Sequence, residues 1–383
     1  MARPEIQPNP FDVEKDDSDR YPDRSRLPQA PGSQFVSSYP GIGAVLAERR
    51  ARPTLGGGIF GGGPLISLGF GFSPTSSDET PFRPPDTQGD VSPTQILVAI
   101  NGRIKVFDRN GTVGTLNTTT DTFFQSVRSA GISDPRVRWD PLLQRWIVIA
   151  IDVASTNNRV TIAVSNSATI TATSSFNFFF FNQSIGGTST SEFADYPTLG
   201  VDKNALYIGT NQFAGTSGGF LGTEGYVVRK SSLTAGGSPV VTHFNRISAN
   251  GGLYTPQGVD NDDPAATEGY FVGVSISFQG QLVLRRVSNP GGTPTISANV
   301  ALTTPATANP IDTPQPGTTA TLSTLDTRLF LAKICEGPGG ARTLWTSHNI
   351  GVNASGVATS ANRTATRWYQ ISGYATGSTP ALV

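Results

Sequence analysis

The residues that could do chemistry in this chain are mostly carboxylates. Asp134 and Asp195 each stand directly before an expected inner strand, and Arg136 follows Asp134 by two positions. Two carboxylates that flank a glycosidic bond can hydrolyse it, provided that they lie at the separation the reaction requires. Sequence gives no distances, and aspartates at such positions also cap turns by hydrogen bonds to the backbone. We therefore treat Asp134, Arg136 and Asp195 as candidate ligand-binding residues and favour turn capping over catalysis.

Four further carboxylates crowd one loop, namely Asp260, Asp262, Asp263 and Glu268. Oxygen-rich loops of this kind can bind calcium. The spacing does not match an EF-hand, and Asp-Asn-Asp-Asp-Pro is also typical of a long solvated turn. We expect no cofactor, with calcium at these four residues as the alternative.

The chain has only two histidines, His243 and His348, and one cysteine, Cys335. No histidine pair has metal-ligand spacing, and the G-x-S-x-G pattern of a nucleophile elbow is absent. His348 is carried as a candidate ligand-binding residue, although a histidine in an apolar strand is usually structural. Cys335 has apolar neighbours and is expected to be a buried, unreactive thiol.

These residues must be positioned by short strands that recur along the chain. An aspartate, a turn and an apolar strand return at intervals of about 50 to 65 residues, at Asp90, Asp140, Asp202, Asp260 and Asp326. Repeats of this length with several short strands each are typical of β-propellers. A β-sandwich would not require the same unit five times. The predicted fold class is therefore all-β, a β-propeller of four-stranded blades with about five blades visible.

The composition excludes some classes of partner. Charged residues make up 15% of the chain and cancel to a formal net charge of +0, so no basic field for nucleic acid exists. No apolar run reaches the roughly 20 residues of a transmembrane helix. The N-terminus lacks the apolar core of a Sec signal peptide.

We divide the chain into an extended Pro/Gly-rich arm, residues 1–83, and propeller repeats, residues 84–383. An incomplete ring would leave sheet edges that invite pairing. The segment from Leu65 to Phe72 alternates glycine with Leu68 and Phe70, and we expect it to complete the chain's own ring or that of a partner subunit.

Several segments resemble a group of bacterial β-propeller proteins that are generally exported and mostly uncharacterised. The matching segments are DPRVRWDPLLQRW, DYPTLGVDKNALYIGTN and TPQGVDNDDPAATEGYF. The resemblance implies the propeller fold and an extracellular or cell-surface location, and it brings no catalytic residues. Similar proteins begin with a signal peptide and continue with further blade sequence after Tyr369, whereas this chain does neither.

The few catalytic groups and the neutral composition favour a non-catalytic surface module for structure, assembly or adhesion. Its expected partners are other copies of the chain, another surface protein or a glycan. The alternative is a secreted, carboxylate-dependent glycoside hydrolase or lyase. Three or more carboxylates, or a set of Asp, His and Arg, converging in one pocket at the channel mouth would favour the enzyme, whereas a plugged or apolar channel would favour the module.

Overall fold

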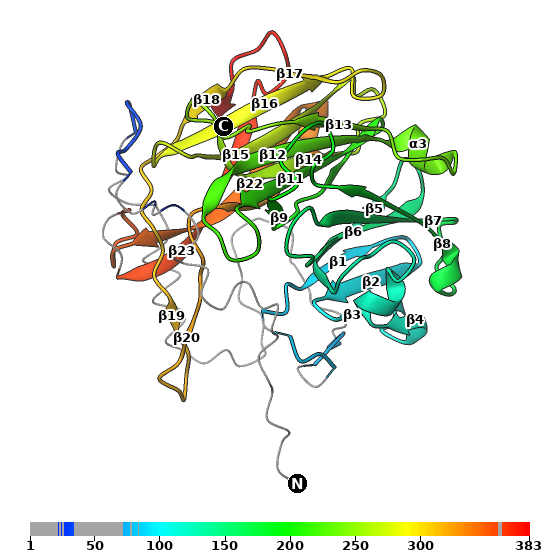
Figure 1. The fold of residues 1–383 in the computed structure, drawn as a ribbon. Helices are drawn as coiled ribbons and strands as arrows, with labels where there is room; N and C mark the ends of the chain where they lie inside the picture. Colours follow the sequence, from blue (N-terminus) through cyan, green and yellow to red (C-terminus); the bar gives the residue numbers. More distant parts are fainter. Residues whose placement is uncertain are drawn as a thin grey trace.

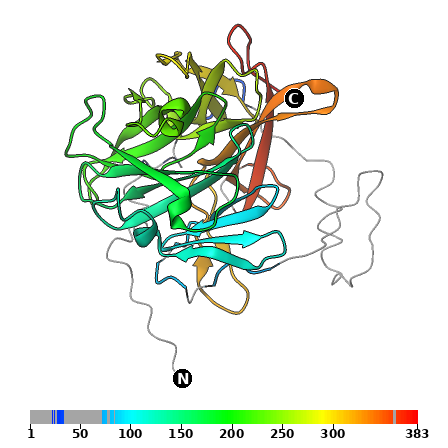
Figure 2. The ribbon, with the colours of Figure 1, turned by 90° about the vertical axis from the view of Figure 1, so that its right-hand side faces the viewer.

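The computed structural model describes residues 22, 24, 27–33, 72–76, 79–82, 84–358 and 362–383. These residues form almost exclusively antiparallel sheet, so the prediction of an all-β propeller with four-stranded blades is confirmed. Figure 1 shows the sheets following one another in chain order, from cyan through green and yellow to red. Figure 2 shows the cyan strands below the green ones from the side. No helix among the described residues is long and apolar enough to cross a membrane.

The structure describes five blades, each an antiparallel meander. Blade 1 comprises β1 (Gln88–Val91), β2 (Gln95–Ile100), β3 (Arg103–Asp108) and β4 (Val113–Thr118). Blade 2 comprises β5 (Ile132–Asp140), β6 (Arg145–Asp152), β7 (Arg159–Ser165) and β8 (Phe176–Asn182). Blade 3 comprises β9 (Phe193–Asp195), β10 (Gly200–Val201), β11 (Ala205–Phe213), β12 (Phe220–Arg229) and β13 (Val241–Phe244). Here β9 and β10 both pair with β11 and share the place of one inner strand.

Blade 4 comprises β14 (Leu253–Asn261), β15 (Glu268–Ser275), β16 (Gln281–Ser288), β17 (Thr295–Ile296) and β18 (Val300–Thr303). Blade 5 comprises β21 (Leu329–Glu336), β22 (Arg342–Val352), β23 (Arg363–Ser372) and β24 (Ala381–Leu382). Between them, β19 (Thr313–Pro314) and β20 (Thr321–Leu322) form a small hairpin. The short helices are α2 (Thr120–Phe123) and α3 (Lys230–Thr234), with 3₁₀ turns at Thr173–Ser175 and Pro338–Gly340.

The first strand of each blade is the innermost. β1 lies against β5, and β10 lies against β14. β14 and β21 pair directly in parallel, with Val259 opposite Ala332, so blades 4 and 5 form one continuous sheet. The inner strands therefore bring residues from all five blades together around one axis.

The hydrophobic core is divided among the interfaces between blades. Along β6, Trp146, Val148 and Ala150 join the cluster shared with blade 1. Ile147, Ile149 and Ile151 alternate with them and join the cluster shared with blade 3. Successive side chains of a strand point to opposite faces, and both faces of β6 are covered. This explains the continuous apolar run from Trp146 to Ile151.

Four of the five repeated aspartates occupy equivalent places, and the fifth does not. Asp140 and Asp202 follow inner strands, and each accepts hydrogen bonds from two backbone N–H groups of the next turn. Asp90 and Asp260 stand at the same end of β1 and β14. Asp326 instead precedes β21, at the opposite end of the axis. The prediction that Asp326 repeats Asp140 was wrong. An aspartate followed by apolar residues occurs both before an inner strand, as at Asp326, and at the end of one, as at Asp140, so this pattern does not distinguish the two ends.

Buried charges join the blades at the end of the inner strands where Asp140 and Asp260 lie. Lys230 Nζ of α3 is 2.6 Å from Asp140 Oδ2, with both side chains almost fully buried. Arg138 Nε of β5 is 2.7 Å from Asp260 Oδ2 of β14. Asp260 Oδ1 also accepts a hydrogen bond from the backbone N–H of Val201. Each aspartate thus caps a strand end and contacts a different blade.

Part of the arm lies outside the described residues. Among the four residues expected to mediate assembly, Leu65, Leu68 and Phe70 are not described. Phe72 packs against Phe107 of β3, with ring centroids 5.0 Å apart. Other described arm residues also contact blade 1: the Thr80 hydroxyl donates to the Asn101 carbonyl at 2.6 Å, and Lys105 of β3 is paired with Glu79.

Replacing Lys230 by Met should lower the free energy of unfolding by about 3 kcal/mol, because Asp140 then stays buried without its cation. The double variant Asp140→Asn, Lys230→Met should recover most of that loss, since neither charge remains. Urea unfolding measures both. Lys203→Met, at an exposed position, is the control and should change stability by less than about 0.5 kcal/mol. A loss in Lys230→Met no larger than in the control would contradict the buried pair.

Candidate functional site

The start of every inner strand carries one residue with left-handed backbone. These are Asp86 (φ 43°), Asp134 (54°), Tyr196 (50°), Thr255 (47°) and Leu325 (54°). Residues other than glycine rarely adopt this left-handed backbone conformation, and a β-branched residue such as Thr255 is strained in it. In β5 and β14 the strained residue coincides with a shift of strand register. Such bulges change the direction in which neighbouring side chains point, and they are common next to active sites.

Two carboxyl groups from neighbouring blades meet at this end of the axis. Asp86 precedes β1, Asp134 lies on β5, and their side chains are hydrogen-bonded to each other. Asn101 Nδ2 donates to Asp86 Oδ2 at 2.8 Å, and the same amide's Oδ1 accepts from the Asp134 backbone N–H at 2.8 Å. Ser133 Oγ donates to Asp134 Oδ1 at 2.8 Å. Asn101 therefore holds the Asp86 carboxyl group and the Asp134 backbone, and Ser133 holds the Asp134 carboxyl group.

The contact between these two carboxyl groups favours a proton on Asp86. Burial, followed by the charge of Asp134, raises the pKa of Asp86 to about 7. Asp134 Oδ2 is buried and accepts no hydrogen bond from an N–H or hydroxyl group of the described residues. Two ionised carboxylates in contact would repel strongly, so one of them retains a proton. A protonated Asp86 supplies the hydrogen bond that Asp134 Oδ2 otherwise lacks.

Arginine and tyrosine side chains alternate beside this pair. The guanidinium carbons of Arg136 and Arg328 each lie 4.8 Å from the centre of the Tyr196 ring. Arg328 also lies 5.9 Å from the Tyr254 ring. Cations over aromatic faces are favourable at these distances. We call this series, together with Arg24, which lies over Tyr254, the arginine–tyrosine ladder.

A third carboxyl group, that of Asp326, is bonded to Arg328 and Tyr254 of the ladder. Arg328 donates from Nε to Asp326 Oδ1 at 2.9 Å and from Nη2 to Asp326 Oδ2 at 3.0 Å. The Tyr254 hydroxyl also donates to Asp326 Oδ2. Burial alone would raise the pKa of Asp326, but the Arg328 charge and these hydrogen bonds lower it to about 2. Asp326 is therefore an anion that stays ionised and paired.

We define the axial cluster as these side chains contributed by all five blades. Its members are Asp86, Asp134, Arg136, Tyr196, Tyr254, Asp326 and Arg328.

The four sequence-predicted ligand-binding residues have different environments. Asp134 and Arg136 are brought together in the axial cluster. Asp195 directly precedes Tyr196 and accepts its backbone N–H at 2.8 Å. His348 is buried on β22, where Nδ1 lies 2.7 Å from the Thr327 carbonyl and Nε2 lies 3.0 Å from the Tyr369 hydroxyl. Burial lowers the pKa of His348 to about 4, so it is neutral near pH 7 and serves as an internal hydrogen-bonding group.

The four carboxylates of the acidic loop face separate partners. Asp260 pairs with Arg138, Asp262 with Lys333 at 2.7 Å and Asp263 with Arg342 at 3.4 Å. Glu268 accepts a hydrogen bond from the Thr376 hydroxyl. Nowhere in the described part of the chain do three His, Cys, Asp or Glu side chains gather so as to hold a metal ion.

Sequence reasoning missed most of the axial cluster. Asp86 lies in Pro-Pro-Asp, which resembles a linker, and Tyr196 resembles a turn residue before proline. One signal was present, because Asp134, Tyr196 and Thr255 each precede a proline at the start of an inner strand. Aligning the repeats on these prolines, rather than on the later aspartates, would have placed Tyr196 beside Asp134 as an equivalent position.

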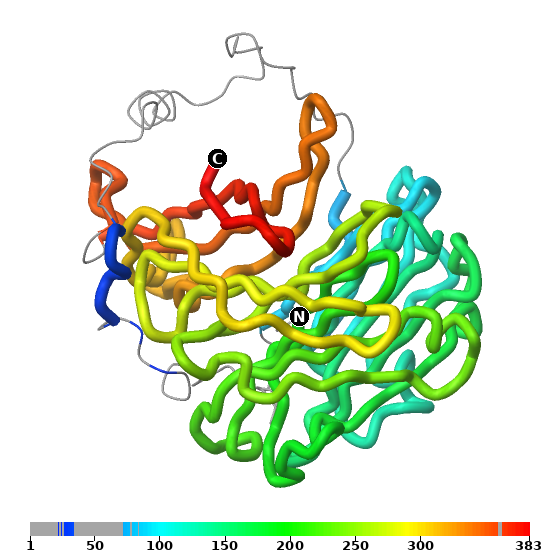
Figure 3. Tube along the Cα trace, turned by 90° about the horizontal axis from the view of Figure 1, so that it is seen from above, coloured from blue at the N-terminus to red at the C-terminus, as the bar shows by residue number. Residues whose placement is uncertain are grey.

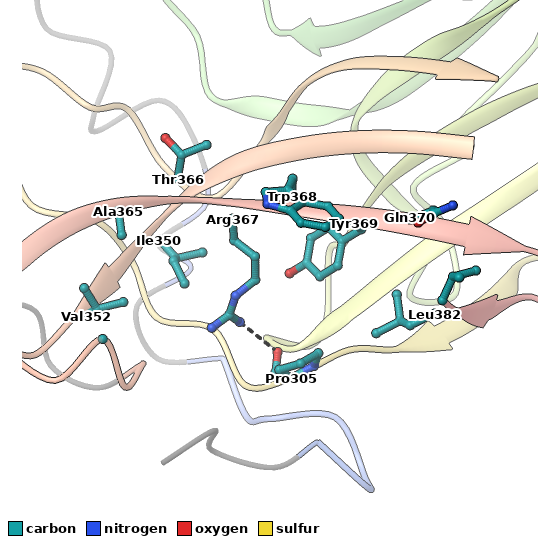
Figure 4. A pocket seen from close by; sticks show the side chains of 12 residues that line it. Pro305, Ile350, Val352, Ala365, Thr366, Arg367, Trp368, Tyr369, Gln370 and Leu382 are labelled. Atoms are coloured by element: carbon teal, nitrogen blue, oxygen red, sulfur yellow. Dashed lines mark hydrogen bonds between the residues drawn. The ribbon is translucent and has the colours of Figure 1, made fainter. Parts of the chain in front are cut away.

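A separate groove of about 420 Å³ lies on blade 5 (Figure 4). It is lined by apolar and aromatic side chains, among them Ile350, Val352 and Trp368. Its one ionisable side chain besides Tyr369 is Arg367, whose Nη1 donates to the carbonyls of Ala306 and Pro305. None of the side chains that line it is a carboxylate or a histidine.

Comparison with known proteins identifies no family for the chain. No family model and no curated protein matches it. Solved structures similar to it include an exo-1,5-α-L-arabinanase from a bovine ruminal metagenomic library (9% identity, TM-score 0.35, covering 78% of this chain and 96% of that chain). Others are a GH43 endo-arabinanase from Bacillus licheniformis (9%, 0.34, 77% and 96%) and an exo-β-1,3-galactanase from Clostridium thermocellum (8%, 0.39, 78% and 60%).

These comparisons correct the functional expectation. These structures are of glycoside hydrolases, which contradicts the expectation of a non-catalytic structural, assembly or adhesion module. Asp86, Asp134 and Asp326 lie at the same end of the axis as Arg136 and Arg328. At such low identities and TM-scores the likeness brings no site residue and no substrate to this chain.

Replacing Asp86 by Asn should reduce the dependence of stability on pH. The folded pKa of about 7 lies above the ordinary value. The unfolded chain therefore loses this proton more readily, and stability falls as the pH rises from about 4 to about 7. Asn cannot ionise. The melting temperature of the variant should therefore fall less than that of the wild type between about pH 5 and about pH 8. The exposed Asp312→Asn is the control and should follow the wild type. Identical pH profiles for Asp86→Asn and the wild type would refute the raised pKa of Asp86.

Proposed function

We propose that the protein is a glycoside hydrolase whose reaction takes place at the axial cluster. The observation that carries the proposal is the contact between the buried carboxyl groups of Asp86 and Asp134, which raises the pKa of Asp86 to about 7. A carboxyl group that stays protonated near pH 7 can donate its proton to a glycosidic oxygen, and raised pKa values of this kind are how hydrolases obtain an acid at neutral pH.

Asp86 is assigned as the general acid. It gives its proton to the leaving oxygen as the bond between that oxygen and the anomeric carbon breaks, and the carboxylate left behind faces Arg136, which favours its charge. Asp134 holds the proton on Asp86 before the reaction. Because the two groups are in hydrogen-bond contact, they are too close to flank a sugar as separate acid and base.

The second catalytic carboxylate is assigned to Asp195. Asp326 is a poor base, because Arg328 holds it in two hydrogen bonds and its pKa is about 2. Asp195 is the last residue of β9 in blade 3, next to Tyr196 of the ladder. There it would activate the attacking water or attack the anomeric carbon itself.

The arginines favour a second reaction class at the same residues. Arg136 and Arg328 could neutralise the carboxylate of a uronic acid, which is what a lyase requires before it removes a proton beside that group. An extracellular or surface location, and membership of the exported propeller group that the segments resemble, are parts of the same proposal, since polysaccharides are met outside the cell.

The proposal is tested on a panel of neutral and acidic polysaccharides and aryl glycosides. Release of reducing ends without an unsaturated sugar identifies hydrolysis, and appearance of the unsaturated sugar identifies the lyase. Asp86→Asn and Asp195→Asn should each lower kcat/KM by about 100-fold or more, because each removes a proton donor or acceptor. Asp90→Asn, at the opposite end of β1, is the matched control and should keep wild-type activity. Full activity in Asp86→Asn would refute the assignment, and no turnover of any substrate would refute the function.

A further inference from the structure

A described part of the N-terminal arm lies on blade 4. The Ala30 N–H donates to the Gln279 carbonyl at 2.8 Å, and the Gln279 N–H donates to the Pro28 carbonyl at 2.9 Å. Gln29 Nε2 donates to the Thr307 carbonyl at 2.6 Å. Figure 3 shows this dark-blue segment beside the yellow strands and loops of blade 4. Main-chain and side-chain bonds thus fix the arm at a defined register.

This attachment places Arg24 inside the propeller. Only 2% of the residue is exposed. Its Nη1 donates to the Ser275 carbonyl of blade 4 at 2.6 Å, and its Nε donates to Thr327 Oγ1, just before blade 5, at 3.2 Å. Gln279 Nε2 holds the Arg24 carbonyl at 2.8 Å. Arg24 therefore bridges blades 4 and 5 from a segment that belongs to neither.

Arg24 is also the last member of the arginine–tyrosine ladder. Its guanidinium carbon lies 4.8 Å from the centre of the Tyr254 ring, whose hydroxyl donates to Asp326. The order of contacts is Arg136, Tyr196, Arg328, Tyr254 and Arg24. A change at Arg24 therefore reaches Arg136, which faces Asp86, through side chains in direct contact.

Burying this cation is costly, and its bonds do not compensate fully. Burial lowers the pKa of Arg24, against the charge of Asp326. Its Nη2 is buried and has no hydrogen-bond partner among the described residues. A side chain needed only to join two blades could be apolar at lower cost. The charge of Arg24 faces the Asp326 carboxylate and the Tyr254 ring, and both belong to the axial cluster.

We propose that Arg24 is a positioning residue of the axial cluster, so that the N-terminal arm completes the site from within the same chain. It holds Tyr254 and Asp326, these hold Arg328, and the ladder sets Arg136 beside the Asp86–Asp134 pair. The inference rests on the proposed function only for its effect on catalysis.

The first experiment measures stability and needs no substrate. Arg24→Met and Asp326→Asn are made singly and together in the full chain, and urea unfolding gives the coupling between the two sites. We expect a coupling of about tenfold or more in the unfolding equilibrium constant. Additive effects would overturn the proposal, since a mere bridge between Ser275 and Thr327 does not depend on Asp326. Arg24→Lys should retain part of the coupling, because it keeps the charge.

The second experiment measures catalysis against pH. Arg24→Met should lower kcat by about tenfold with KM little changed, whereas the exposed Arg363→Met should match the wild type. The charged groups that face Asp86 are Asp134 and Arg136, and the Arg136 charge lowers the pKa of Asp86. If Arg136 shifts away, that pKa rises, so the loss of activity at high pH should move to higher pH. Arg24→Lys should restore both features.

A reduced kcat with an unmoved pH profile would overturn the positioning role. If the wild type turns over no glycan, the proposed function fails, and the coupling between Arg24 and Asp326 still decides whether the arm belongs to the cluster.

Discussion

Charged groups buried between the inner strands must neutralise one another, and this requirement ties the blades together. At one end of the axis Lys230 of blade 3 meets Asp140 of blade 2, and Arg138 of blade 2 meets Asp260 of blade 4. At the other end the carboxyl groups of Asp86 and Asp134, of blades 1 and 2, are in contact, and this contact and burial raise the pKa of Asp86. A buried ion left alone is strongly destabilising. These contacts between charged or titratable groups therefore join blades 1 to 4 to one another.

The repeat could be recognised from the sequence because its signals are local. An aspartate that caps a turn before an apolar strand is a property of a few consecutive residues, and Asp140 and Asp202 behave as expected. It was harder to assign which end of the inner strand each repeated aspartate marks. Asp326 has the same local pattern as Asp140, yet it precedes an inner strand instead of following one. Only the pairing of β21 with β14 distinguishes the two ends.

The site was mostly hidden because its members are far apart in sequence. Asp134 and Arg136 were recognised by residue type, but the raised pKa of Asp86 comes from the approach of another blade. The acidic loop looked like a calcium site because the cations that face it, Arg138, Lys333 and Arg342, come from other strands. The four consecutive phenylalanines from Phe178 to Phe181 lie on β8, the outermost strand of blade 2. Phe180 is 39% exposed there, and the guanidinium carbon of Arg159 lies 4.1 Å from the centre of its ring.

The parallel pairing of β14 with β21 has a consequence for how the molecule opens. Backbone hydrogen bonds join blades 4 and 5, whereas blades 1 and 2 are separate sheets that meet through side chains such as Asn101 and Asp90. Native proteins unfold partially in cooperative units that follow such boundaries. We therefore expect the amide hydrogens of blades 4 and 5 to exchange with solvent as one unit.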